Sequence, residues 1–160
     1  MTNKQNNQKQ ETMNSYRQFL FHIVFCTYER KNTLPTEHHE ELYKYLWGVI
    51  KTHKGVLYRI NGVENHLHIL CDLHPTVCIS DLIKDMKVGS NLWIKQTGNF
   101  PKFESWAEGY FAATYSNKDK EMIINYIKNQ KQHHHTTTFE DEYRALLDEH
   151  GVAWDEKYIF

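Results

Sequence analysis

Two apolar runs joined by a very short connection constrain this fold more than any other feature of the chain. Residues 56–61 and 66–73 both read as strands, because they are rich in β-branched and large apolar side chains. Only residues 62–65 lie between them. A parallel pair needs a crossover connection far longer than this, so the two runs are expected to form an antiparallel hairpin.

Other runs supply the elements that precede this hairpin. Residues 17–28 are apolar on both faces, which is typical of a central strand covered on both sides. A helix is expected to follow a cap at Thr36 and to stop near residues 54–55. The helical spacing of its apolar residues predicts its buried face, formed by Leu42, Leu46, Val49 and Ile50.

The elements after the hairpin follow from the same kind of pattern. Spacings of three and four residues predict a second helix, with a buried stripe of Ile79, Leu82, Ile83, Met86 and Trp93. Residues 110–115 read as a fourth strand, and Ser116 is expected to start a third helix. A fourth helix is predicted over residues 139–149, between a cap at Thr138 and a stop at Gly151.

The order of these elements is strand, helix, strand, strand, helix, strand. This order predicts an α+β fold of the ferredoxin-like split β-α-β type. Such a fold has one antiparallel sheet with two helices on one face. The third helix comes after the last strand of the sheet, so we expect it to lie across the other face.

Length and composition favour one domain and a cytoplasmic location. A chain of 160 residues with 40% hydrophobic residues is long enough to bury a core, and we assign residues 16–160 to a single domain. Residues 1–15 are rich in Asn, Gln and Lys and are expected to form a disordered tail. The three cysteines form no C-x-x-C pair, and no run is apolar enough to cross a bilayer. These observations favour a reducing cytoplasm and no membrane partner.

The net charge of the chain does not by itself indicate a nucleic-acid partner. The formal net charge is −1, so contact with nucleic acid would need a local basic surface. The second predicted helix offers Lys84, Lys87 and Lys95, which lie off its apolar stripe. Two interpretations stay open: a solvated helix face, or a face that contacts phosphates.

A histidine pair stands inside the third predicted strand. Side chains alternate along a strand, so His66 and His68 share one face while Leu67 points to the other. Their Cα atoms should lie roughly 6.5–7 Å apart, twice the rise per strand residue. Two imidazoles at this spacing can bind one cation. The chain contains 11 histidines, however, so a chance H-x-H pattern is the alternative.

The third predicted helix carries a second polar pair. Tyr126 and Gln130 are four residues apart and therefore share a helix face beside an apolar stripe. Alone, Tyr126 reads as an aromatic residue at the edge of the core rather than as a nucleophile. Three aromatic residues in the loop between residues 98 and 109 can either stack unpaired bases or pack in the core: Phe100, Phe103 and Trp106.

Taken together, these pieces resemble a known family across residues 16–160. The matching segments are 21–25, 63–70, 81–94, 106–110, 116–118 and 126–130, the last followed by His133 and His134. In this order they are similar to the single-tyrosine HUH transposases of hairpin-ended insertion sequences, the IS-two-hundred type. The resemblance implies a homodimer that cleaves and rejoins single-stranded DNA hairpins at element ends through a 5′-phosphotyrosine intermediate.

The resemblance also implies a role for each residue of the predicted site. His66 and His68 match the two histidine metal ligands, Tyr126 the nucleophile, and Gln130 the third ligand. Two imidazoles and one amide oxygen leave positions open for phosphate and water, which suits Mg²⁺ or Mn²⁺ better than a closed zinc site. No P-loop or dinucleotide-binding glycine motif is found, so no nucleotide cofactor is expected.

One departure from the family pattern bears on the site, and the histidines after Gln130 need an interpretation of their own. Many relatives have Asp before the first histidine, where this chain has Asn65, so the orientation of His66 is expected to be weaker. The segment His133–His135 reads better as a frayed helix end than as an additional metal or phosphate contact.

Two other function classes compete with the transposase interpretation. The first is a ferredoxin-like module that binds single-stranded nucleic acid without cutting it. The second is a metal-dependent hydrolase in which Tyr126 only packs.

Overall fold

The computed structural model describes residues 16–160, so the tail predicted for residues 1–15 lies outside the described residues. A four-stranded antiparallel sheet forms the centre of the molecule, in the strand order β2-β3-β1-β4. The strands are β1 (Leu20–Cys26), β2 (Val56–Gly62), β3 (His66–Asp72) and β4 (Phe111–Tyr115). The predicted hairpin is β2-β3, and the strand order is that of the predicted ferredoxin-like fold.

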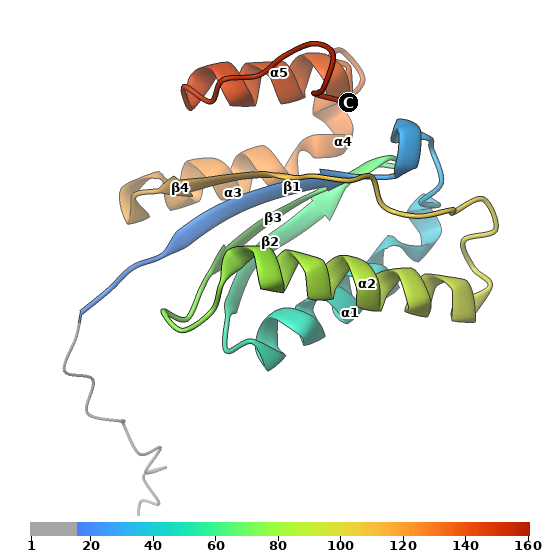
Figure 1. Cartoon of the computed structure of the whole chain (residues 1–160), viewed down its shortest axis with the longest axis horizontal. Helices are drawn as coiled ribbons and strands as arrows, with labels where there is room; N and C mark the ends of the chain where they lie inside the picture. The colour runs from blue at the N-terminus through green and yellow to red at the C-terminus, as the bar shows by residue number, and fades with distance from the viewer. Residues whose placement is uncertain (1–15) are drawn as a thin grey trace, which may run out of the picture.

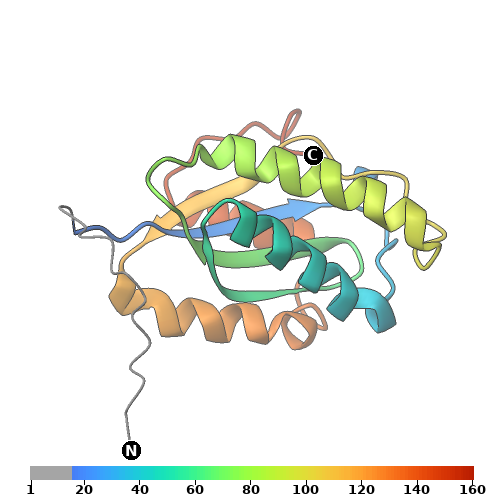
Figure 2. The same ribbon diagram turned by 90° about the horizontal axis from the view of Figure 1, so that it is seen from below.

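The helices cover the two faces of the sheet unequally. Figure 1 shows α1 (His39–Thr52) and α2 (Ile79–Thr97) below the sheet and three further helices above it. The upper group is α3 (Lys120–Lys128), α4 (Gln130–His133) and α5 (Phe139–Glu149). From below, α1 and α2 lie in front of the sheet, and α3 runs along its β2 edge (Figure 2). The predicted placement of two helices on one face and the tyrosine helix on the other is confirmed.

Alternation along β3 divides its side chains between these two layers. Leu67, Ile69 and Cys71 belong to the core between the sheet and helices α1 and α2. The other side chains face α3, α4 and α5, and Leu70 packs there against Ile123 and Ile127. A one-residue slip of β3 would exchange the two sets, so the buried apolar residues fix which way the histidines point.

Truncating Leu67 should destabilise the fold strongly. Its side chain is 0% exposed, and Leu67→Ala leaves a cavity beneath the histidine strand. We expect a loss of about 2–5 kcal/mol in the free energy of unfolding. Urea denaturation would measure it, with Leu92→Ala as the matched control, because Leu92 is 57% exposed on α2. Equal losses in the two variants would contradict the assignment of Leu67 to the core.

The aromatic loop between α2 and β4 belongs to the core. Phe100, Phe103 and Trp106 are all buried, and they pack in the core between the sheet and helices α1 and α2. Trp106 Nε1 donates a hydrogen bond to Ser90 Oγ at 2.8 Å, which satisfies its polar atom inside the core. The packing interpretation is therefore confirmed, and the base-stacking interpretation of these rings is wrong.

Two of the three predicted helix caps are wrong. Thr36 and Ser116 make no capping hydrogen bond with their side chains, and each introduces a short 3-10 turn, Thr36–His38 and Asn117–Asp119. These turns satisfy part of the helix start with backbone bonds, so no side-chain cap is needed. Thr138 does cap α5, because its Oγ accepts a hydrogen bond from the Asp141 N–H at 3.2 Å.

Helix α5 closes over the end of the sheet. Phe139, Leu146 and Leu147 pack against Val24 and Phe111. The predicted stop is confirmed, because Gly151 takes the left-handed backbone conformation with φ +63°. In the described part of the chain, no helix is both long and apolar enough to cross a membrane.

Candidate active site

Strand β3 places the predicted histidine pair in the layer between the sheet and the upper helices. His66 and His68 are both fully buried, and their ring centroids lie 5.2 Å apart. His68 pairs with Val24 of β1, so it stands near the middle of the sheet. A buried imidazole must find polar partners, and these come from α3, α4 and α5.

Helix α3 brings Tyr126 to this pair within one chain. Ile123 and Ile127 pack on Leu20 and Leu70, which fixes the helix against the sheet. Asn61 Nδ2 of β2 donates hydrogen bonds to the carbonyls of Ile127, at 3.0 Å, and of Lys128, at 3.1 Å. The Tyr126 ring then lies 5.7 Å from the His68 ring, centroid to centroid.

Gln130 reaches the same place although the helix breaks before it. Helix α3 ends at Lys128, and Gln130 starts the short helix α4. The Gln130 side chain is fully buried, and its Oε1 lies 3.0 Å from His134 Nε2. The structure thus brings together all four of the residues predicted for the metal and the nucleophile.

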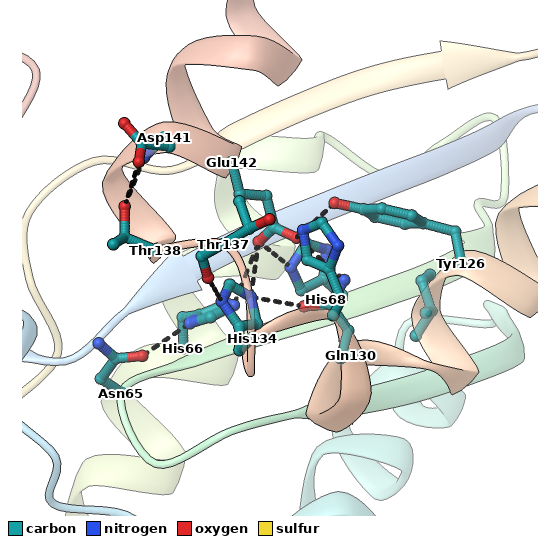
Figure 3. Close-up of polar contacts among 12 residues, drawn as sticks. Asn65, His66, His68, Tyr126, Gln130, His134, Thr137, Thr138, Asp141 and Glu142 are labelled. Atoms are coloured by element: carbon teal, nitrogen blue, oxygen red, sulfur yellow. Dashed lines mark hydrogen bonds and ion pairs between the residues drawn. The ribbon is translucent and has the colours of Figure 1, made fainter.

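The centre of the site is Glu142 of α5, a residue that sequence reasoning missed. Figure 3 shows the surrounding side chains converging on its carboxylate. Its Oε1 lies 2.9 Å from His68 Nε2, 3.3 Å from His66 Nε2 and 3.2 Å from His134 Nε2. One carboxylate oxygen therefore faces three imidazole nitrogens.

The second oxygen of Glu142 faces the nucleophile side. Glu142 Oε2 accepts a hydrogen bond from the Tyr126 hydroxyl and another from Gln130 Nε2 at 3.1 Å. His133 Nε2 also lies 3.1 Å from this oxygen. The prediction of a frayed end for His133–His135 is wrong for His133 and His134, because Glu142 draws both rings into the site.

Neighbouring groups fix the proton positions on two of the rings. Asn65 Nδ2 donates to the Arg30 carbonyl, so Asn65 Oδ1 is the atom that accepts from His66 Nδ1 at 2.7 Å. The Thr137 carbonyl likewise accepts from His134 Nδ1 at 2.8 Å. When neutral, His66 must therefore point a bare Nε2 lone pair at the Glu142 oxygen. His134 differs: burial alone would lower its pKa, but the hydrogen bond with Glu142 raises it, and its Nε2 also faces the acceptor oxygen of Gln130.

The third ring is held from behind by His22 of β1. His22 Nε2 lies 2.9 Å from His68 Nδ1, and the two rings stack at 5.1 Å between centroids. Burial, and secondarily the charge of a protonated His68, hold the pKa of His22 well below its ordinary value. A neutral His22 can accept a hydrogen bond from His68 Nδ1–H. This bond fixes the orientation of the His68 ring, whose Nε2 faces Glu142.

Burial and charge set the protonation of the site. Burial lowers the pKa of His66 to about 4, so this ring is neutral at physiological pH. Burial alone would raise the pKa of Glu142, but its contacts with His134, His66 and His68 hold that pKa well below the ordinary value. Burial, followed by the Glu142 charge, raises the pKa of Tyr126, so the phenol keeps its proton in this arrangement.

These protonation states fit a bound cation. The Nε2 of a neutral His66 and the Oε1 of Glu142 face each other, and both are acceptors with no hydrogen between them. His66 Nε2 makes no hydrogen bond. A buried polar atom without a partner is costly, and a cation satisfies both acceptors together. His66, His68, His134 and Glu142 each offer one ligand atom, and these four atoms lie within 4.8 Å of one another.

A cleft between α3 and α5 leads to the Tyr126 phenol. It has a volume of about 300 Å³, and Tyr126 and Glu142 line it together with Met122 and Ala145. Tyr126 is partly exposed there, whereas Glu142 is 3% exposed. A ligand in this cleft would therefore lie beside the Tyr126 ring.

The three lysines predicted to contact DNA lie elsewhere. Lys84, Lys87 and Lys95 belong to α2, which covers the opposite face of the sheet. Lys87 Nζ donates to the carbonyls of Ala107, at 2.9 Å, and Gly109. The structure does not bring these side chains to the histidine site, and their contact with DNA stays a prediction.

The sequence did carry a signal for Glu142. Its neighbours on the buried stripe of α5 are Phe139 and Leu146, at three residues before and four residues after it. An acid on the apolar stripe of an amphipathic helix is unusual, because a buried carboxylate needs partners. That signal marks Glu142 as a residue of interest but does not name the histidines around it.

Comparisons with known proteins identify the family of the chain and support its fold. The family described as "Transposase IS200 like" matches residues 15–130, which is well over half of the chain. No curated protein matches. A solved structure of a protein assigned as a transposase, from Deinococcus radiodurans R1, is similar with a TM-score of 0.59 at 21% identity, covering 74% of this chain and 95% of that one.

A second solved structure is similar over more of this chain. It is a REP-associated tyrosine transposase bound to a REP hairpin, with a TM-score of 0.50 at 16% identity, covering 88% of this chain and 76% of that one. At these identities the two structures support the fold, and the family match supports the relationship. The chain belongs to the IS200-like transposase family.

Proposed function

We propose that this transposase cleaves and rejoins single-stranded DNA through a covalent bond between Tyr126 and a 5′-phosphate. The observation that carries the proposal is the meeting of the Tyr126 hydroxyl with the His66 and His68 imidazoles on one carboxylate. The phenol loses its proton as its oxygen attacks the scissile phosphorus, the bond between phosphorus and the 3′ oxygen breaks, and the leaving oxygen takes up a proton to give a free 3′-OH. A new 3′-OH can reverse the step, because the phosphotyrosine keeps a diester bond.

A divalent cation belongs to this proposal. His66 and His68 would hold it, with Gln130 as the third ligand by resemblance, and Mg²⁺ or Mn²⁺ are the candidates. When bound, such an ion neutralises charge that develops on the phosphate and aligns it for attack. The chain's own residues do the rest: β3 fixes the imidazoles, Asn65 and His22 orient them, and α3 holds the phenol.

The proposed substrate is a single-stranded DNA hairpin at an element end. One structural relative is described as bound to a REP hairpin, which supports a hairpin partner here. Lys128 and Lys131 are exposed on α3 and α4, the elements that carry Tyr126 and Gln130. Their ammonium groups are candidates for phosphate contacts along the β2 edge of the sheet.

The homodimer implied by the resemblance remains a proposal. Tyr126 meets the histidine pair inside one chain in this structure, so a single protomer contains every residue of the proposed site. A dimer would then serve to hold two DNA ends together rather than to complete the chemistry.

The test of the proposed function is covalent capture. The protein, a labelled single-stranded hairpin oligonucleotide and Mg²⁺ or Mn²⁺ should yield a protein–DNA adduct that survives denaturation. A binding module would retain the hairpin without any adduct. A metal-dependent hydrolase would cut the DNA and leave no DNA on the protein.

Removing the partner of His66 should weaken metal binding. Asn65→Ala deletes the acceptor of the His66 Nδ1 proton, so the ring loses its fixed orientation. We expect Mn²⁺ affinity to fall by about 10–100-fold, as measured by isothermal titration calorimetry. Asn99→Ala is the control, because Asn99 bonds Glu41 far from the site. Unchanged Mn²⁺ affinity in Asn65→Ala would show that Asn65 does not support the ligand.

A further inference from the structure

Helix α5 lies beyond the segment that carries the family match, yet it supplies the central residue of the site. The match ends at residue 130, and both His134 and Glu142 come after it. The family relationship therefore assigns no role to either residue. Their place in the site has to be argued from the contacts of this chain.

The contacts of Glu142 indicate that its carboxylate is a metal ligand rather than a side chain that only fills the place of the ion. Three ring nitrogens from three different backbone positions lie within 3.3 Å of one carboxylate oxygen. Two of these rings have their Nδ1 protons committed to Asn65 and to the Thr137 carbonyl. This is the arrangement by which proteins aim histidines at a metal, with a second hydrogen bond fixing each ring.

Charge balance leads to the same conclusion. Glu142 is 3% exposed, and its ion-pair partners in the described part of the chain are all histidines. A buried carboxylate needs a counter-charge, and the ring nitrogens around Glu142 Oε1 leave its place beside them. A dication would provide it, and the negative ligand would bind that ion more strongly than an amide oxygen does.

The second oxygen gives the carboxylate another contact. Glu142 Oε2 accepts the hydrogen bond of the Tyr126 hydroxyl, while Oε1 faces the imidazoles. The two oxygens of one planar group thus hold the nucleophile beside the cation site. The cleft between α3 and α5 is lined by both Tyr126 and Glu142, so the phenol and the carboxylate border the same opening.

We propose that Glu142 and His134 complete the cation site with His66 and His68, and that Glu142 also positions Tyr126 beside the bound ion. Glu142 is then a positioning residue for the nucleophile as well as a ligand. The metal part needs only the contacts described here, whereas the positioning part rests on the proposed function.

Metal binding without DNA tests the first part. Wild-type protein, Glu142→Gln and His134→Asn would be titrated with Mn²⁺ and with Co²⁺, by calorimetry and by the visible absorption of bound Co²⁺. We expect both variants to lose about 100-fold or more in affinity and the Co²⁺ spectrum to change. Glu121→Gln is the matched control, because Glu121 is exposed on α3. His134→Asn keeps the test valid should Glu142→Gln fail to fold.

The opposite result has a clear meaning. If Glu142 only occupied the place of the ion, Glu142→Gln would bind Mn²⁺ as tightly as wild type or more tightly, and Gln130→Ala alone would lose affinity. That outcome would overturn the proposed ligand set. A wild-type protein that binds neither ion would overturn it too.

Rates of adduct formation test the second part. Glu142→Gln should require more Mn²⁺ for half-maximal adduct formation and should also stay slower than wild type at saturating Mn²⁺, by about 10-fold or more. Full recovery at saturating Mn²⁺ would remove the positioning role and leave only the ligand. A wild-type protein that binds Mn²⁺ but forms no adduct would refute the phosphotyrosine function without touching the metal assignment.

Discussion

Tyr126→Phe is expected to abolish the covalent adduct between the protein and a hairpin oligonucleotide. The substitution removes one oxygen and leaves the ring, which packs near the His22 and His68 rings. Because the missing oxygen is the proposed nucleophile, we expect a complete loss of adduct formation and not merely a slower rate. Denaturing gel electrophoresis of a labelled oligonucleotide would report the loss, and hairpin binding should change little.

A second tyrosine separates this effect from general damage. Tyr143 is partly buried on α5, where its ring lies 5.4 Å from the Phe139 ring and 5.8 Å from the Phe160 ring. Tyr143→Phe makes the same chemical change outside the site and should leave adduct formation near the wild-type level. An adduct that persists in Tyr126→Phe would show that another group attacks the DNA.

Sequence reasoning found the residues that lie on regular elements of the sheet and the helix beside it. The alternation around Leu67 predicted a shared face for His66 and His68, and the structure buries both on that face. The i, i+4 spacing of Tyr126 and Gln130 predicted a shared direction, and both reach one carboxylate. The first prediction succeeded because the strand period is a local property of the chain. The second holds although the helix breaks at Asn129, because Gln130 starts α4 directly after the break.

The remaining site residues depend on the way the C-terminal segment folds back. His134 follows the break at Asn129, and Glu142 lies on α5, which packs across the end of the sheet. No local period specifies where a separate helix docks. The prediction of a frayed end for His133–His135 failed for that reason, since it considered α3 without the helix that covers it.

The helix starts failed for a different physical reason. Both α1 and α3 begin through a 3-10 turn whose bonds are made by the backbone. Side chains that favour caps then mark the start of the turn rather than the start of the helix. The error moves each helix by a few residues and leaves the stripe that packs on the sheet unchanged.

Removal of divalent metal should separate DNA cleavage from DNA binding. A chelator is expected to slow adduct formation by about a thousandfold, because an ion that stabilises phosphate charge contributes several kcal/mol to the barrier. Hairpin affinity should change only a few-fold, because exposed lysines, for which Lys128 and Lys131 are the proposed candidates, would hold the duplex phosphates rather than the buried histidines. Adding Mg²⁺ or Mn²⁺ back should restore the rate.

The chelator result becomes specific to this site when it is repeated in His68→Ala. His68 is fully buried and contacts both Glu142 and His22, so its loss removes one ligand and the orientation of the others. This variant should be slow with or without chelator, because it has little bound metal to lose. A Leu92→Ala protein should respond to the chelator as wild type does, since Leu92 is exposed on α2. Cleavage by wild type that is equally fast with and without chelator would mean that the phenol and the carboxylate act without an ion. The buried Nε2 of His66 would then need a proton instead.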